Sequence, residues 1–374
     1  MLYALTFPVH RRLAWTVMLL LLFGHVILFS ATGVMGLQRY GSEFHYVIRQ
    51  AICSAVGLAA MVLIARVPHS TWRKIALPGI LGQIAIVALT LFSPFAHHAQ
   101  GASRWLRIGE VAFQPSELSR ITVALYVAHL LTLRQEGKIR WKHVPVRLLP
   151  VVALFALLLR QPDMGTTIQL TLVTASLLFL AGIRLRYFAG AAALGGLAVM
   201  YLTLTSDYRR RRLFAFLNPW ADPQGSGFQT IQSFMSFLSG KIFGVGLGNG
   251  NSKLFFLPEV HTDFIFALVG EELGFVGAIG LCFAFFYLCY LVCLAPSRAK
   301  DIFGSYFAFG LALSIVLPIL VNLGGVTGLL PVKGLPLPFI SWGRSALLVN
   351  LLITGLLLSI LRGPVTTPSD TREA

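Results

Sequence analysis

Charged residues are scarce in this sequence, and acidic residues are the scarcest. Lysine, arginine, aspartate and glutamate together make up 12% of the 374 residues, and only 14 of them are acidic. A soluble domain typically carries about 25% charged residues, roughly twice this fraction. Because 56% of the residues are hydrophobic, the composition excludes an ordinary soluble globular domain.

Cysteines and the familiar catalytic motifs are also few or missing. Four cysteines are too few for a disulfide scaffold, and all four lie in apolar runs, where they suit packing between helices. There is no Walker motif, no His-Glu-x-x-His and no Gly-x-Ser-x-Gly, and the glycines of residues 244–248 lack the spacing of a dinucleotide loop. These absences exclude the common nucleotide-binding, zinc-protease and serine-hydrolase sites.

The net charge of +16 does not indicate a nucleic-acid partner. The chain has no zinc-finger pattern, no RNP motif and no basic heptad region. Its basic residues lie in short segments between apolar runs, so we expect no nucleic acid among its partners.

Long apolar runs are what the sequence has in abundance. A bilayer span needs about 20 mostly apolar residues, and it must be helical because lipid offers the backbone no hydrogen-bond partners. The runs predict an all-α polytopic membrane protein, one domain of residues 1–374 with ten transmembrane helices. The predicted spans are residues 13–33, 45–65, 75–93, 116–133, 146–160, 164–183, 187–205, 262–294, 303–323 and 344–362. The first run is too long for a signal peptide, so we expect an uncleaved anchor.

The distribution of charge predicts which side of the membrane each loop faces. Short cytoplasmic loops are rich in lysine and arginine, which places the N-terminal tail (residues 1–12) and the C-terminal tail (363–374) in the cytoplasm. Most acidic residues then fall on the outer side: Glu43, Glu110, Glu117, Asp163, Asp207, Asp222, Glu259, Asp263, Glu271 and Glu272. Since ionisable groups at membrane depth are costly and usually functional, we expect any chemistry on the outer face.

One predicted loop is long, at about residues 206–261 between the seventh and eighth spans. A loop of this length in a compact protein is usually functional or disordered. Pro219, Trp220 and the glycines of 244–248 give it a mixed composition, so we expect an ordered segment that re-enters the membrane or lies on its surface. The four arginines of residues 209–212 are most simply a patch that faces lipid headgroups.

The strongest candidate for chemistry is the segment that leads from the long loop into the eighth span. Glu259, His261 and Asp263 precede an apolar helix within this segment. The simplest interpretation is that Thr262 or Asp263 caps the helix. A carboxylate held half out of water beside aromatic residues should instead have a raised pKa and can act as a general base.

The outer loop before the fourth span contains a second group of polar residues. Arg104 and Trp105 lie in this loop, and Trp105 alone would suit an anchor at the membrane interface. Ser116 resembles a helix N-cap. Glu117 and Arg120 are three residues apart and can form a pair on one helix face, which in its simplest form is a buried structural pair.

Two further outer turns complete the set of candidates. Asp163 lies in the turn of residues 160–166, and its simplest interpretation is a cap of the sixth span. Residues 328–345 form a loop rich in proline and glycine that contains Lys333 and Arg344. Prolines interrupt helices, and irregular backbone at membrane depth is tolerated where it lines a cavity.

These segments resemble those of the SEDS family, whose members act in cell shape, elongation, division and sporulation. The resemblance spans nearly the whole chain. Within the family, the Pro-Trp-Ala-Asp-Pro stretch at 219–223 favours the division branch over the elongation branch. The motifs that carry the resemblance are residues 101–109 with 113–120, 161–166, 217–227 with 231–233, 257–266 with 270–274, and 328–345.

The resemblance implies a peptidoglycan glycosyltransferase that polymerises lipid II, a disaccharide-peptide on undecaprenyl pyrophosphate, at the outer face of the cytoplasmic membrane. The implied partners are lipid II, the growing glycan strand, membrane lipid, a class B penicillin-binding protein transpeptidase and other membrane proteins of the division machinery. The aspartate of the family's His-Thr-Asp motif maps onto Asp263, the expected catalytic residue. The expected substrate-binding residues are Arg104, Trp105, Glu117, Arg120, Asp163, Glu259, His261, Lys333, Ser341 and Arg344.

The chain departs from the family pattern at two positions. Arg120 stands where a lysine is usual, which keeps the charge but changes its geometry. Arg344 stands where the family has glycine, and an arginine is chemically suited to a pyrophosphate.

Three questions stay open at the level of sequence. No motif requires a cofactor, although a divalent cation (Mg or Mn) shared by Asp263 with Asp163 or Glu259 would be chemically reasonable. A lipid II flippase or transporter would need polar residues deep in several spans. A non-catalytic scaffold would need Asp263 only for folding.

Overall fold

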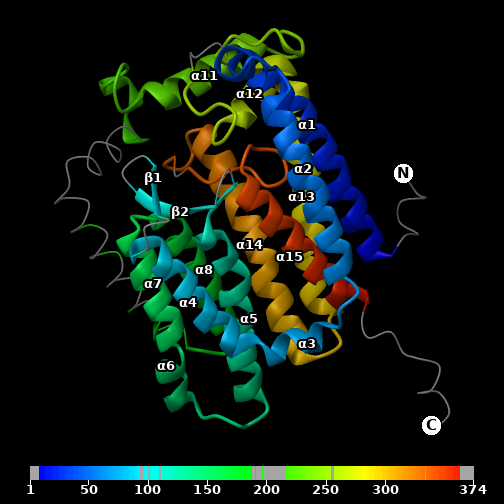
Figure 1. Cartoon of the computed structure of the whole chain (residues 1–374), viewed down its shortest axis with the longest axis vertical. Helices are drawn as coiled ribbons and strands as arrows, with labels where there is room; N and C mark the ends of the chain where they lie inside the picture. The colour runs from blue at the N-terminus through cyan, green and yellow to red at the C-terminus, as the bar shows by residue number, and fades with distance from the viewer. Residues whose placement is uncertain are drawn as a thin grey trace.

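The computed structural model describes residues 8–92, 96–99, 102–108, 111–184, 216–253, 257–332 and 334–362, with a few single positions between 186 and 200. The chain forms a bundle of long helices that run along its longest axis (Figure 1). Within the described residues, six helices are long and apolar enough to cross a membrane. The protein is therefore a helical membrane protein with several long apolar helices.

The described helices are, in chain order, α1 (Val9–Tyr40), α2 (His45–Ile64), α3 (His69–Lys74), α4 (Ala76–Phe92), α5 (Pro115–Gln135), α6 (Val144–Arg147), α7 (Leu149–Arg160), α8 (Met164–Leu180), α11 (Phe228–Gly240), α12 (Ile265–Glu272), α13 (Gly274–Arg298), α14 (Ile302–Val326) and α15 (Arg344–Arg362). Two short 3-10 turns, Trp141–His143 and Pro219–Ala221, accompany them.

Nine of the ten predicted spans coincide with these helices. The seventh, residues 187–205, lies outside the described residues except for single positions, so the total of ten stays a prediction. The predicted span 262–294 is divided in the structure: α12 ends at Glu272 and α13 begins at Gly274. Gly274 has a φ of +68°, a conformation that glycine adopts without steric cost.

Burial is unequal among the helices and shows which of them form the centre of the bundle. In the most apolar window of α15, 78% of residues are buried inside the protein, whereas the corresponding figure for α2 is 22%. A helix that is apolar all round suits either a protein core or a membrane. The peripheral α2 and α13 therefore turn apolar side chains outward, among them Ile52, Val56, Phe283 and Phe286.

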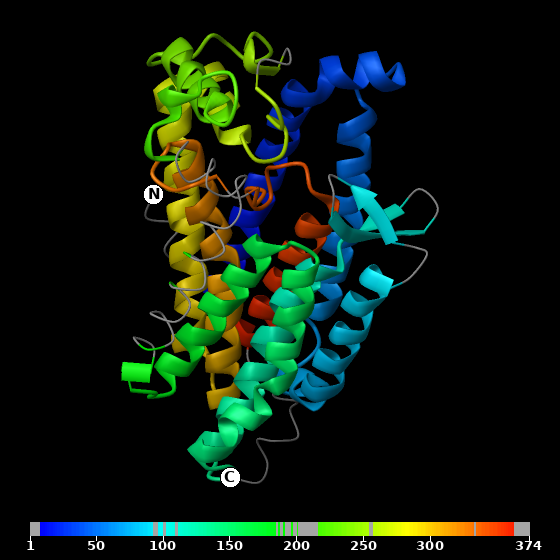
Figure 2. The same cartoon turned by 90° about the vertical axis from the view of Figure 1, so that its left-hand side faces the viewer.

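A small antiparallel sheet precedes α5, at the place of the predicted outer loop that contains Arg104 and Trp105. Its strands β1 (Ala96–Ala99), β2 (Ala102–Ile108) and β3 (Val111–Phe113) lie in the order β1-β2-β3. Figure 2 shows the sheet at the side of the bundle. The helical membrane fold is as predicted, the sheet is an element that the prediction did not include, and Arg104 and Trp105 lie in its central strand.

The long loop contains an ordered segment, as predicted. Helix α11 lies across one end of the bundle, next to α12 (Figure 1). Ser233 of α11 donates a hydrogen bond of 2.8 Å to the carbonyl of Val326, the last residue of α14. The arginines of 209–212 lie outside the described residues.

Candidate functional site

Asp263 lies in a turn and not in the helix that follows it. The backbone amides of Thr262 and Asp263 each donate to the carbonyl of Glu259 over 3.1 Å. Helix α12 begins two residues later, and its N-cap residue is Phe264, which makes no side-chain capping bond. The simplest interpretation of Asp263, that it caps this helix, is therefore wrong.

Asn322 of α14 fixes this turn against the loop that precedes α15. Its side-chain amide donates to the backbone carbonyl of Asp263 over 2.9 Å and to the carbonyl of Leu335 over 2.8 Å. A Cβ atom added at Gly334 would lie 3.2 Å from the Asp263 carboxylate oxygen Oδ2. The carboxylate of Asp263 thus lies beside the backbone of the last loop, partly exposed.

His261 and Trp342 make a second connection between the turn and the last loop. The amide of Trp342 donates to the carbonyl of His261 over 2.8 Å. The ring of Tyr46 contacts both, with its centroid 5.1 Å from that of Trp342 and 5.9 Å from that of His261. Burial is the main cause that lowers the pKa of His261. The positive charge of Arg39 also lowers this pKa, and the negative charge of Glu259 raises it in part. The imidazole is therefore predominantly neutral at pH 7.

The remaining expected residues of these two loops divide into structural and exposed ones. The Ser341 hydroxyl accepts a 2.9 Å hydrogen bond from the amide of Leu337, which closes the loop on itself. Glu259 is exposed, and its carboxylate accepts from the Thr262 hydroxyl over 3.1 Å. Arg344 lies at the start of α15, with its guanidinium 6.0 Å from the Trp342 ring centroid. Lys333 lies outside the described residues.

Asp163 is the centre of a second polar group. As predicted it caps α8, because its carboxylate accepts from the amide of Thr166 over 3.3 Å. The same carboxylate accepts from the hydroxyl of Ser116 over 2.9 Å. Ser116 is therefore not the N-cap of α5, a position that Gln114 occupies. The backbone amide of Gln114 donates to the Ser345 hydroxyl over 2.9 Å, which joins this group to the start of α15.

Arg104 holds the small sheet against the turn between α7 and α8. Its guanidinium donates to the carbonyl of Gln161 over 3.1 Å and to that of Pro162. Trp105, its neighbour in β2, is half-buried and pairs with His97 of β1. The sheet thus brings Arg104 within two residues of Asp163, a proximity that their separation in sequence does not reveal.

Glu117 and Arg120 form the buried pair that their spacing predicts. Their charged atoms lie 3.0 Å apart, and the two residues are 8% and 3% exposed. Arg120 also donates to the Asn350 side-chain oxygen over 2.7 Å and to the carbonyl of Ser314. A buried pair with this many hydrogen bonds joins α5, α14 and α15, so the geometry favours a positioning role over direct contact with substrate.

A further polar cluster was not predicted, and Lys253 is its central residue. The Lys253 ammonium lies 3.0 Å from a Glu272 carboxylate oxygen, and Ser30 of α1 donates to the same carboxylate over 2.7 Å. Glu271 accepts the amides of Asn251 and Ser252. The glycine-rich loop (residues 244–253) therefore wraps the end of α12. The sequence signal was present, since a Glu-Glu pair in an apolar span requires partners.

The described residues give no support to a shared metal ion. Among them, no group of three or more histidine, cysteine, aspartate or glutamate side chains could hold an ion. Asp163 is fully engaged with Ser116 and Thr166, and Glu259 is exposed. The arrangement thus does not fit the shared divalent cation considered for Asp263.

An apolar groove of about 760 Å³ opens between α11, α12, α13 and α14. Its lining includes Phe237, Phe266, Phe275, Ile279 and Leu323. Asp263 is not among its lining residues. The groove continues onto the exposed aromatic face of α13.

Comparison with known proteins agrees with this architecture. A family model described as a cell cycle protein, covering FtsW, RodA and SpoVE, matches residues 11–364. The probable peptidoglycan glycosyltransferases FtsW of Geobacter metallireducens and Coxiella burnetii are 41% and 39% identical to the chain. The alignments cover 92% of both chains for the first and, for the second, 93% of this chain and 95% of the relative.

Two solved structures share the fold. A chain of a peptidoglycan synthase complex that coordinates polymerization and crosslinking is 28% identical, with a TM-score of 0.75 over 94% of this chain and 96% of that one. The rod shape determining protein RodA of Thermus thermophilus is 25% identical, with a TM-score of 0.69 over 94% and 95%. From the match to nearly its whole length, this chain belongs to the FtsW/RodA/SpoVE family, the SEDS family of the sequence analysis.

Proposed function

We propose that this chain is a peptidoglycan glycosyltransferase in which Asp263 is the catalytic base. The relatives named above carry this activity in their names. The observation that supports the role of Asp263 is its position: a partly exposed carboxylate beside Gly334, in a turn that Asn322 fixes to the last loop. A group held in this way is positioned before substrate arrives, as general-base catalysis requires.

The reaction joins two lipid-linked disaccharides. The acceptor hydroxyl gives its proton to Asp263 while its oxygen forms a bond to the anomeric carbon of the donor sugar. The bond between that carbon and the pyrophosphate oxygen breaks, and its electron pair leaves with undecaprenyl pyrophosphate. Arg344 is the first residue of α15. Its positive charge and the N-terminus of the helix would together stabilise the negative charge of the departing pyrophosphate.

Arg104 and Asp163 support the site from the side of the sheet. Arg104 is only partly buried in β2, so its positive charge is near the surface of the outer half. Asp163 is 5% exposed and fixes α5 to α8 through Ser116. We assign substrate binding to Arg104 and Arg344, and positioning to Asp163, Glu117 and Arg120.

The cellular role that fits this chain is septal wall synthesis in division. The relatives at about 40% identity are named FtsW, and the family model that matches the chain is described as a cell cycle protein. With the positive residues of the loops inside, both termini are cytoplasmic and Asp263 faces the outside of the inner membrane, where lipid II polymerisation takes place.

A class B penicillin-binding protein transpeptidase is the partner we assign. The similar chain from a synthase complex that coordinates polymerization and crosslinking supports a partner of this kind. A transmembrane helix of the partner would find an apolar surface at the groove between α11, α12, α13 and α14, which continues onto exposed Phe275, Phe283 and Phe286. Residues packed there would not cover Asp263.

One assay separates this function from its two alternatives. Purified full-length chain with a transpeptidase-inactive partner is incubated with lipid II in detergent, and the products are separated by length. A polymerase yields glycan strands, whereas a flippase or a scaffold yields none in detergent, where there is no bilayer to cross. A mock preparation from cells that lack this chain controls for contaminating polymerases. If the preparation that contains this chain makes no glycan strands, the proposed function is wrong.

A further inference from the structure

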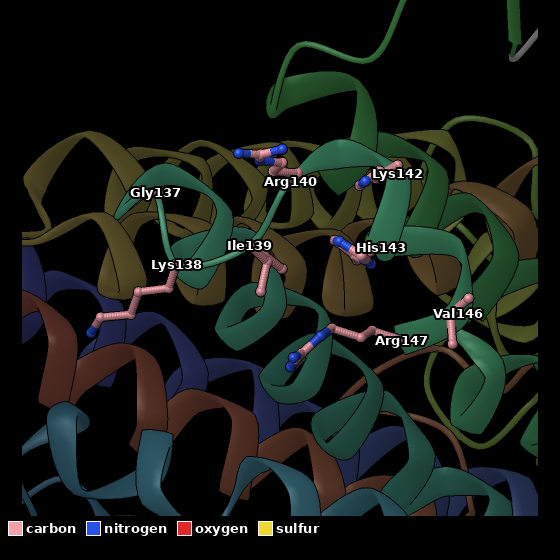
Figure 3. A pocket seen from close by; sticks show the side chains of 8 residues that line it. All are labelled: Gly137, Lys138, Ile139, Arg140, Lys142, His143, Val146 and Arg147. Atoms are coloured by element: carbon pink, nitrogen blue, oxygen red, sulfur yellow. The ribbon is translucent and has the colours of Figure 1, made fainter.

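The end of the bundle opposite Asp263 carries a cavity that the polymerase function does not use. The segment between α5 and α7 lies at this end, around α6 (Figures 1 and 2). The cavity measures about 570 Å³, within the usual range of small-molecule sites. Five of its eight lining residues carry basic side chains (Figure 3): Lys138, Arg140, Lys142, His143 and Arg147.

The walls of the cavity are ordered by a small core of their own. Ile139 and Val144 are buried and pack with Leu130 of α5, apart from the main core. The Arg134 guanidinium lies 4.9 Å from the centroid of the Trp141 ring, within cation–π distance. The hydroxyl of Tyr126 donates to the Arg147 carbonyl over 2.6 Å. These contacts give the basic residues a fixed frame, which a merely solvated loop would lack.

The carboxylate nearest to the cavity in sequence neutralises only the part of its positive charge that Lys138 carries. Glu136 lies 2.7 Å from both Arg73 and Lys138, and hydrogen bonds from these two cations lower its pKa to about 2. Within the described part of the chain, neither Arg140 nor Arg147 has an ion-pair partner, and the same holds for Lys142. No acidic residue lines the cavity.

The cavity also borders a surface that suits lipid. Val146 lines the cavity and is 65% exposed, and the exposed Leu149 and Val152 follow it along α7. Apolar side chains exposed on a membrane helix face the acyl chains, whereas the basic group beside them lies at headgroup level. Basic pockets on the cytoplasmic side of membrane proteins bind phosphate-containing headgroups.

We propose that this cavity binds the headgroup of an anionic phospholipid of the cytoplasmic leaflet, with its phosphate between Arg140, Lys142 and Arg147 and its acyl chains along Val146 and α7. The choice of leaflet rests on the orientation proposed above. A cytoplasmic position alone would explain the basic residues in this loop. It would not explain the cavity, or the small apolar core and the Arg134–Trp141 contact that order its walls.

The test measures retained lipid on the full-length protein. Wild type and the triple variant Arg140→Gln, Lys142→Gln, Arg147→Gln are purified from vesicles of phosphatidylglycerol and phosphatidylcholine, and bound lipid is counted by native mass spectrometry. Each basic residue near an anionic lipid contributes about fivefold, so the triple variant should retain phosphatidylglycerol on the order of 100-fold more weakly. The control variant Arg66→Gln, Lys74→Gln, Arg298→Gln removes equal charge from other exposed positions at that end and should retain it like wild type.

Three outcomes would overturn the proposal. They are equal retention of the two lipids by wild type, unchanged retention by the triple variant, and full displacement of the lipid by inorganic phosphate at millimolar concentration, which would indicate a site for a soluble phosphate. Failure here is distinguishable from failure of the proposed function, because the readout is bound lipid. Asp263→Asn should retain phosphatidylglycerol like wild type, even though its polymerisation is lost.

Discussion

At the scale of single residues, the acidic side chains differ in what surrounds them. Asp163 caps a helix, Glu117 pairs with Arg120, and Glu272 pairs with Lys253. Each of these is buried and satisfied inside the bundle. Asp263 differs from these three, since it is partly exposed beside the backbone of the last loop while its main chain is fixed by Asn322 of α14. A carboxylate so placed can meet a substrate hydroxyl, and the buried ones cannot without rearrangement.

Asn322 should matter for catalysis because it fixes Asp263 to the last loop. Asn322→Ala removes two hydrogen bonds to backbone carbonyls, and each carbonyl left without a partner costs about 1–3 kcal/mol. We expect a polymerisation rate at least tenfold below wild type, with lipid II binding less affected. Thr327→Ala is the matched control, since the Thr327 hydroxyl bonds only carbonyls of its own helix. Equal rates for wild type and Asn322→Ala would show that this connection does not position Asp263.

His261 should make the protein less stable in mild acid. Burial lowers the folded-state pKa of His261 below its ordinary value of 6.5. Between that value and the lower folded pKa, the unfolded chain binds more protons, so stability is full above 6.5 and falls as the pH decreases below it. Thermal unfolding from about pH 7.5 to about pH 5 should show this fall, and His261→Gln should reduce it. An unchanged pH dependence in the variant would contradict the account.

At the scale of the helices and strands, the length of the apolar runs was enough to predict the positions of most long helices. The apolar runs located α2, α4, α7, α8, α14 and α15 within a few residues, because a span must be long, apolar and helical, whereas α1 extends seven residues beyond its predicted end. The break at Leu273 was missed because only Glu271 and Glu272 interrupt the apolar residues on either side, and the close approach of Gly274 to the backbone of Ile242 and Gly244 joins segments that the apolar pattern does not relate. The sheet was missed because its strands are short and pair only with one another.

The glycine-rich loop should depend on Gly244 far more than on Gly248. Both have positive φ, 81° and 84°, so alanine is strained at both positions. A Cβ at Gly244 would lie 2.2 Å from the Glu272 carbonyl oxygen, whereas at Gly248 it would meet open space. We expect Gly244→Ala to destabilise the protein by about 1–3 kcal/mol more than Gly248→Ala, the cost of overpacking. Thermal unfolding in detergent measures this difference. Equal losses of stability in the two variants would contradict the close approach of Gly244 to the Glu272 carbonyl.

At the scale of the whole molecule, the two ends of the bundle carry opposite chemistry. The predicted outer end holds Asp263, Asp163 and Glu272, and the other end holds the basic cavity around Arg140 and Arg147. Charge counting along the sequence predicted this division. It could not predict which acidic side chains would have hydrogen-bond partners, because partners such as Ser116 for Asp163 and Ser30 for Glu272 come from distant segments. The sequence motifs therefore predicted a candidate site, and the packing shows what surrounds each of its described residues.

The orientation is open to a direct check with thiol labelling. In a cysteine-free background, Ser226→Cys in the long loop should react with a membrane-impermeant maleimide on intact spheroplasts. Lys142→Cys at the other end should react only after the membrane is permeabilised. Both positions are exposed in the structure, so access is limited by the membrane alone. The reverse pattern would place Asp263 in the cytoplasm and contradict the proposed mechanism.

The central claim is that Asp263 removes a proton from the acceptor hydroxyl. The most direct measurement is the initial rate of glycan polymerisation from lipid II by purified Asp263→Asn, compared with wild type at equal occupancy and equal thermal stability. Asparagine keeps the size of the side chain but cannot accept the proton, so the account predicts a rate lower by about 10²–10⁴-fold, the usual contribution of a general base. A stable Asp263→Asn protein that makes strands at the wild-type rate would contradict it.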